Sequence, residues 1–152
     1  KSFVELQKEV FAKQIRLANE LNLPIAVHDR EAHKDTFDII KASRVRKGLI
    51  HAFSGSKELA QEYIKMGFYI SVGGVVTFKN SNLYKVVDAI GIKNILLETD
   101  SPYLTPVPYR GQKNSSKYIP LIAEKVAEIL SLSIENVSEN TLSSMYNLFD
   151  LK

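Results

Sequence analysis

Two histidines and an aspartate each come at or just after the end of a short apolar run, at His28, His51 and Asp100. Imidazole nitrogen and carboxylate oxygen are ligands for divalent cations, and in a metal-dependent hydrolytic site the cation keeps an open position for water or substrate. The chain has no cysteine, so a metal would be held by nitrogen and oxygen. Because the carboxyl ends of parallel strands share one edge of a sheet, we predict that these three residues bind one metal site.

A glutamate lies two residues before the aspartate of this group. Glu98 and Asp100 therefore leave the same face of a strand, one layer apart. We predict that Asp100 is catalytic, binding metal or activating water, and that Glu98 orients a metal-binding group by a hydrogen bond. An alternative is that Glu98 simply pairs with a buried Lys or Arg.

The elements that must position these residues follow from hydrophobic periodicity. Helical spacing predicts helices over residues 3–22, 32–45, 57–66, 83–90, 118–130 and 137–149, the first with one buried apolar face. Compact apolar runs predict strands at 25–27, 49–50, 68–72 and 95–97. These runs do not alternate with polar residues, which is typical of strands covered by helices on both faces. Residues 103–117 are rich in Pro, Gly, Asn and Ser and predict a long loop.

This alternation predicts an α/β fold with parallel strands in about four βα units. A closed (βα)8 barrel needs about 250 residues, so we expect the C-terminal half of a distorted TIM barrel. We predict a single partial domain over 1–152. The chain opens at Lys1 without an initiator Met, so we expect a piece of a longer polypeptide.

Net charge and hydropathy bear on the charge of the substrate and on the cellular location. The formal net charge is +3 and the pI is about 9.0, a mild excess that tolerates a polyanionic substrate without requiring one. No apolar run is long enough to span a membrane and no signal peptide is visible, so we expect no membrane partner and a cytoplasmic location.

Three runs in this order resemble the TatD family of metal-dependent deoxyribonucleases. They are PIAVHDR at 24–30, HAFSG at 51–55 and LETDSPYL at 97–104. The resemblance implies a TIM barrel of the amidohydrolase-like group that removes nucleotides from DNA with one or two divalent cations. It matches His28, His51 and Asp100 to metal ligands. The family's other ligands, a His-x-His pair and a glutamate before the first helix, are absent, so we expect weak or no activity alone.

The substrate and the metal can be specified only in part. We predict that Arg30, Arg110 and Asn114 contact substrate phosphates, since guanidinium and amide groups bind phosphate oxygens. Single-stranded DNA is the expected substrate. Tyr103 and Tyr109 could stack on bases, although packing under the loop is the stronger expectation. Magnesium, manganese, zinc and cobalt all suit His and Asp ligands.

Two other functions remain open at this stage. An amidohydrolase of a small amide or ester would share the barrel and the ligands. Alternatively, the half-barrel is an assembly module that docks with a missing N-terminal half, or with itself, to close its sheet edges.

Overall fold

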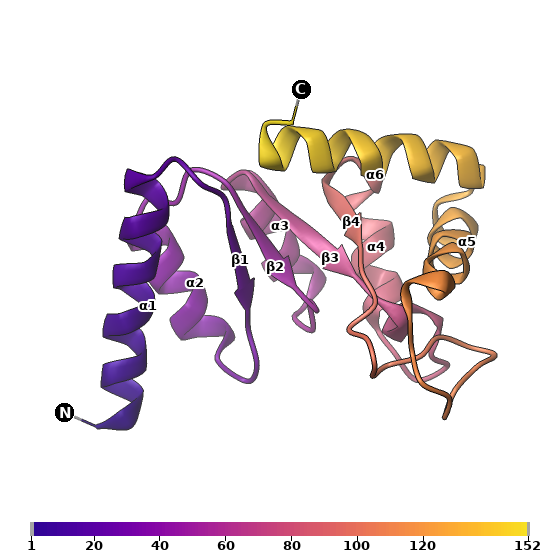
Figure 1. Cartoon of the computed structure of the whole chain (residues 1–152), viewed down its shortest axis with the longest axis horizontal. Coiled ribbons are helices and arrows are strands. Elements are labelled where there is room, and N and C mark those ends of the chain that lie inside the picture. Colours follow the sequence, from indigo (N-terminus) through magenta and orange to yellow (C-terminus); the bar gives the residue numbers. More distant parts are fainter. Residues whose placement is uncertain (1, 152) are drawn as a thin grey trace.

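A parallel four-stranded sheet forms the centre of the molecule in the computed structural model, which describes residues 2–151. Its strands, in spatial as well as sequence order, are β1 (Ile25–His28), β2 (Gly48–His51), β3 (Phe68–Val72) and β4 (Ile95–Leu97). Each strand lies beside the next one along the chain (Figure 1). The predicted α/β fold with parallel strands is thereby confirmed.

Helices connect the strands and also lie before the first strand and after the last. They are α1 (Phe3–Glu20), α2 (His33–Ala42), α3 (Lys57–Lys65), α4 (Leu83–Ile90), α5 (Ile119–Leu130) and α6 (Ile134–Phe149). Short 3-10 turns occur at Gly74–Thr77 (η1), Ile92–Asn94 (η2) and Ser116–Tyr118 (η3). The helix α6 begins three residues earlier than its apolar spacing predicts. The reason is that the Ser133 side chain accepts the Asn136 amide at 3.1 Å and caps the helix.

The sheet is covered by helices on one face only, so the prediction of strands covered on both faces is wrong. Val27, Ile50 and Ile70 point into the helical layer and are at most 5% exposed. The alternate residues of β1 and β2 are more accessible, since Ala26 is exposed and Leu49 is half-buried. Successive side chains of a strand leave opposite faces. The second face, which also carries the strand-end residues, is therefore open within the part of the chain described.

Tyr63 of α3 anchors the buried layer. Its ring meets Phe37 at 5.4 Å and Phe68 at 5.8 Å between centroids. The phenol is fully buried, yet its hydroxyl has no hydrogen-bond partner within residues 2–151. Gly48 makes room for this cluster, because a Cβ there would lie 2.2 Å from the Phe68 ring. The packing of α3 on the sheet thus depends on the large ring of Tyr63 and on the absence of a side chain at Gly48.

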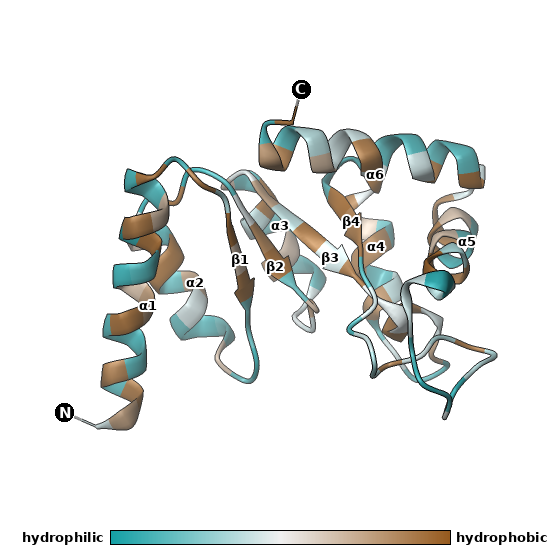
Figure 2. Cartoon of the chain, viewed as in Figure 1, coloured by the Kyte–Doolittle hydropathy of each residue, from teal (hydrophilic) through white to brown (hydrophobic). Residues whose placement is uncertain are grey.

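Helix α1 leaves most of its apolar face exposed, which corrects the prediction of one buried face. Ile15 is its one buried residue. Large apolar side chains that are at least 44% exposed lie along the helix at Phe3, Val4, Leu6, Val10, Leu17 and Leu21. Figure 2 shows these apolar segments on a helix that stands beside the edge strand β1.

No helix within residues 2–151 has the length and apolarity needed to cross a membrane.

Candidate metal centre and adjoining pocket

The three predicted metal ligands lie at the carboxyl edge of the sheet. His28 and His51 end β1 and β2 and are register partners, with ring centroids 5.6 Å apart. Asp100 follows β4 by three residues, and its carboxylate approaches the His51 ring. The strand ends therefore gather these side chains from positions that are 72 residues apart in the chain.

Glu98 holds both His51 and the backbone beside it. One carboxylate oxygen accepts a hydrogen bond from Nδ1 of His51, and the other accepts the Ala52 amide at 2.7 Å. An ionised carboxylate can only accept, so Nδ1 carries the hydrogen, which leaves Nε2 of the neutral ring with a lone pair for a cation. Glu98 has no Lys or Arg partner in the described chain, so that alternative is wrong.

The second imidazole nitrogen of His51 lies at a distance from Asp100 that suits a shared cation. Nε2 of His51 lies 3.2 Å from Oδ1 of Asp100. Two ligand atoms that bind one cation at about 2.1 Å are separated by about 3 Å, so this pair fits. His28 does not join them, because no three His, Asp or Glu residues within 2–151 are close enough to hold one ion. The chain thus provides a partial ligand set.

Three of the strand-to-loop junctions contain a non-glycine residue in the left-handed backbone region. The residues are Glu31, Ala52 and Asp100, with φ of +56°, +48° and +59°. Such conformations cost about 1–3 kcal/mol each and persist where surrounding contacts enforce them. At Ala52 that contact is the hydrogen bond from its amide to Glu98. The backbone around the ligands is therefore held in a specific, unfavourable shape, as is common at functional sites.

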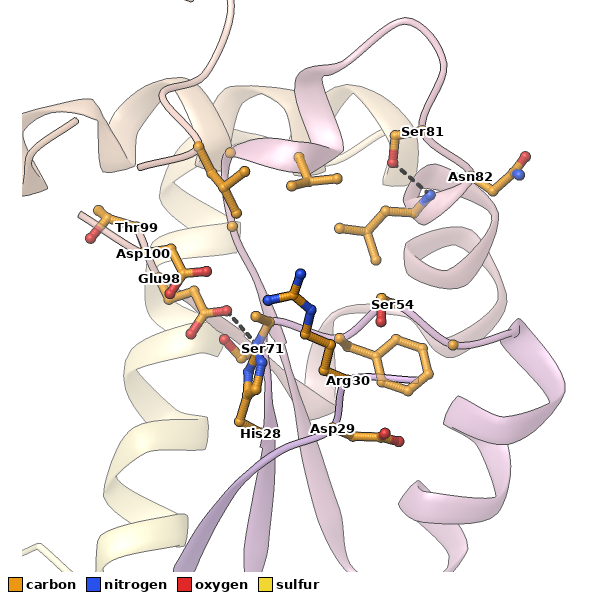
Figure 3. A pocket seen from close by; sticks show the side chains of 18 residues that line it. His28, Asp29, Arg30, Ser54, Ser71, Ser81, Asn82, Glu98, Thr99 and Asp100 are labelled. Carbon is orange, nitrogen blue, oxygen red and sulfur yellow. Dashed lines mark hydrogen bonds between the residues drawn. The ribbon is translucent and has the colours of Figure 1, made fainter. Parts of the chain in front are cut away.

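A pocket of about 560 Å³ opens beside these residues. His28, Glu98 and Asp100 form part of its wall, and Arg30 extends its guanidinium into it (Figure 3). Arg30 makes no hydrogen bond or ion pair with the described residues. Its charge is therefore available to a bound anion.

Arg110 lies away from this pocket. Its guanidinium covers the Phe78 ring at 3.8 Å from the centroid and donates to the Thr105 carbonyl at 3.2 Å. Both interactions are within the long loop and the segment that packs under it. In this structure Arg110 therefore braces the loop instead of lining the pocket.

Asn114 is also a structural residue of the loop, which corrects the prediction that it contacts substrate. The side chain is only 2% exposed. Its Nδ2 donates to the carbonyls of Thr99 and Tyr103, each at 2.6 Å, and its Oδ1 accepts the Ser115 amide. These contacts use both amide hydrogens, so Asn114 ties the two ends of the loop together and does not meet solvent.

Two pocket residues were not singled out from the sequence. Asp29 is 5% exposed and accepts hydrogen bonds from the Ala32 amide and from Nδ1 of His33 at 2.7 Å. An Asp shortly before a helix is a residue type that often accepts a nearby backbone amide, which is the signal that could have identified it. Ser71 on β3 is 1% exposed, and its hydroxyl has no partner within residues 2–151. A single Ser inside an apolar strand gives no signal of this kind.

Comparison with known proteins places this site in context. A family model described as TatD related DNase matches residues 1–150. A Bacillus subtilis protein named uncharacterized metal-dependent hydrolase YabD is 44% identical over 152 residues, which are 98% of this chain and 60% of that protein. The Escherichia coli K12 protein named uncharacterized metal-dependent hydrolase YcfH is 36% identical, over 95% of this chain and 56% of that protein.

A solved structure gives the same result for the fold. The crystal structure of YjjV, a TatD homologue from Escherichia coli K12, superposes with a TM-score of 0.91 at 27% identity. The match covers 97% of this chain and 58% of that one. The chain therefore spans less than two thirds of the length of these relatives, and its four strands correspond to part of a TatD barrel.

Proposed function

Because the chain belongs to the TatD related DNase family, we propose that it forms part of a divalent-cation-dependent site that hydrolyses phosphodiester bonds in DNA. The supporting observation is the arrangement around one imidazole. Glu98 holds Nδ1 of His51, while Nε2 lies 3.2 Å from Asp100. A histidine whose second nitrogen is bound to a carboxylate is the usual form of a metal-ligating histidine.

The residues that would hold the cation are His51 and Asp100, with His28 beside them. Magnesium, manganese, zinc or cobalt would suit these donors. When bound, such an ion polarises a phosphoryl oxygen and activates water for in-line attack. The printed names of the Bacillus subtilis and Escherichia coli relatives, which describe metal-dependent hydrolases, support this class of reaction.

The chain's own side chains supply the remaining functions. Glu98 fixes the tautomer and orientation of His51 through two hydrogen bonds. Arg30, which has no hydrogen-bond or ion-pair partner among residues 2–151, is placed to hold a non-bridging phosphate oxygen. Asp100 offers a carboxylate at the pocket wall that can accept a proton from attacking water. We propose cleavage from a DNA end.

Incubation of the chain with a labelled single-stranded oligonucleotide and each of the four cations tests this proposal. Because the chain holds only part of the ligand set, we expect slow release of nucleotides, which EDTA abolishes and which His51→Ala lowers by more than 10-fold. His33→Ala is the matched control, since His33 bonds to Asp29 and does not line the pocket. Failure to release nucleotides with every cation contradicts the proposal. Cleavage of a small ester instead would favour the amidohydrolase alternative.

A second function is supported by a separate observation at the β1 edge of the sheet. Phe11 and Leu17 of α1, with Leu21 just after it, form a groove with Ile25 and Ala26 of β1. β1 is an edge strand that pairs only with β2 in the described sheet. We propose that this apolar edge docks another βα unit, whose strand would pair with β1 and cover the groove.

A further inference from the structure

The long loop that follows Asp100 combines positive charge with aromatic rings. Residues 101–117 contain Arg110, Lys113 and Lys117 and no acidic residue. The same segment carries Tyr103 and Tyr109. Cations that track phosphates, together with aromatic faces that stack on bases, are the two features of sites for single-stranded nucleic acid.

Among the exposed aromatic rings of this loop, Tyr103 is the one nearest in sequence to Asp100. Its side chain is 73% exposed, contrary to the expectation that it packs under the loop. Tyr109 differs, because it stacks on Tyr118 at 5.0 Å between centroids. The Tyr103 ring is therefore the one whose faces are free to take a partner.

The backbone that carries Tyr103 is held on both sides. Its amide donates to the Asp100 carbonyl at 2.9 Å, and its carbonyl accepts Nδ2 of Asn114 at 2.6 Å. The next residue, Leu104, has φ of +56° and lines the pocket. Solvent exposure of this ring thus comes from a fixed backbone and not from a loose loop tip.

The rest of the loop is braced against the segment after β3. The Val107 amide donates to the Thr77 hydroxyl at 2.9 Å. The loop backbone at Leu104 also packs closely on Gly74, where an added Cβ would lie 2.2 Å from the Leu104 carbonyl oxygen. Preorganisation of this kind lowers the entropy that a loop loses when it binds a ligand.

We propose that this loop is a docking platform for single-stranded DNA, with a base stacked on Tyr103 and phosphates held by Lys113 and Lys117. The inference rests on the proposed function for its choice of ligand. Tyr103 lies three residues after Asp100, and Leu104 belongs to the pocket wall. A base on this ring would therefore adjoin the nucleotide whose phosphate is in the pocket. In a duplex the base faces are not available, so the platform selects single strands.

Binding measured in EDTA tests the platform separately from hydrolysis. Fluorescence anisotropy is recorded with a short labelled oligothymidylate and with an abasic strand of equal length and charge. We expect Tyr103→Ala to weaken oligothymidylate binding about 5- to 30-fold and to leave abasic binding unchanged. Tyr103→Phe keeps the ring and should bind within about twofold of the native chain. Lys113→Ala should weaken both strands alike and reduce the salt dependence.

The matched control is Tyr146→Ala. Tyr146 of α6 is 42% exposed and lies with Lys47 and Gly67 at the amino ends of the strands, the edge opposite the platform. It should leave both affinities unchanged. Equal loss for both strands in Tyr103→Ala, no loss, or no binding of the native chain to oligothymidylate would overturn the inference. Base-dependent binding without hydrolysis would retain it and reject the proposed activity.

Discussion

Glu98 connects the last residue of β2 with the residue after it, accepting hydrogen bonds from the imidazole of His51 and from the amide of Ala52. The carboxylate therefore fixes the ring that faces Asp100 and also a backbone turn with positive φ. Hydrogen bonds behind a metal-ligating histidine raise its basicity and orient it. The relationship makes Glu98 a positioning residue for the proposed metal site.

Replacement of this carboxylate by its amide should weaken the site without removing a ligand. We expect Glu98→Gln to lower cation affinity by about 10- to 100-fold in titration calorimetry. Glu62→Gln on the exposed face of α3 is the control and should not change the affinity. Native cation affinity in Glu98→Gln would show that the hydrogen bond to His51 is not part of the site.

Tyr63 gives a prediction about stability and pH. Burial, with a smaller effect of the Asp29 charge, raises the pKa of Tyr63 above its ordinary value of 10.0. The unfolded chain therefore loses this proton near pH 10 while the folded chain keeps it, so stability falls as the pH rises above 10. We expect urea denaturation to show a steeper alkaline loss for the native chain than for Tyr63→Phe.

The same variant tests whether the Tyr63 hydroxyl is an unpaired buried group. Removal of such a hydroxyl should leave the free energy of unfolding at pH 7 unchanged or raise it by about 1 kcal/mol. A loss of more than about 1 kcal/mol at pH 7 would mean that the hydroxyl has a hydrogen-bond partner.

The exposed groove between α1 and β1 predicts association. We expect sedimentation equilibrium to show a mass above that of one chain, increasing with concentration. The double variant Leu17→Glu with Leu21→Glu should remain monomeric, because charge in an apolar interface costs desolvation energy. Leu142→Glu on α6, which is 50% exposed, is the matched control. A native chain that is monomeric at every concentration would remove the support for docking at this edge.

Sequence patterns predicted the elements well, for a physical reason. The strands at residues 68–72 and 95–97 and the helix at 83–90 agree with the structure, since compact apolar runs and helical spacing report local geometry. Burial depends on what covers an element. The apolar faces of α1 and of the sheet were therefore expected to be covered, and within the described chain they are exposed.

In the candidate site, too, local patterns predicted where residues lie but not what surrounds them. Strand ends gave the positions of His28, His51 and Asp100, because parallel strands place their carboxyl ends together. The roles of Arg110 and Asn114 depend on how a 15-residue loop folds on itself and against the η1 segment, which no local pattern specifies. The positive φ of Ala52 and Asp100 was equally hidden, since neither residue type requires it.

The central claim is that His51 binds a divalent cation with Asp100, and cation titration tests it most directly. Calorimetry with zinc or manganese should give one measurable site per native chain, with affinity reduced at least about 10-fold in both His51→Ala and Asp100→Ala. His33→Ala should match the native chain. Unchanged affinity in either His51→Ala or Asp100→Ala, or no cation binding by the native chain, would contradict the account.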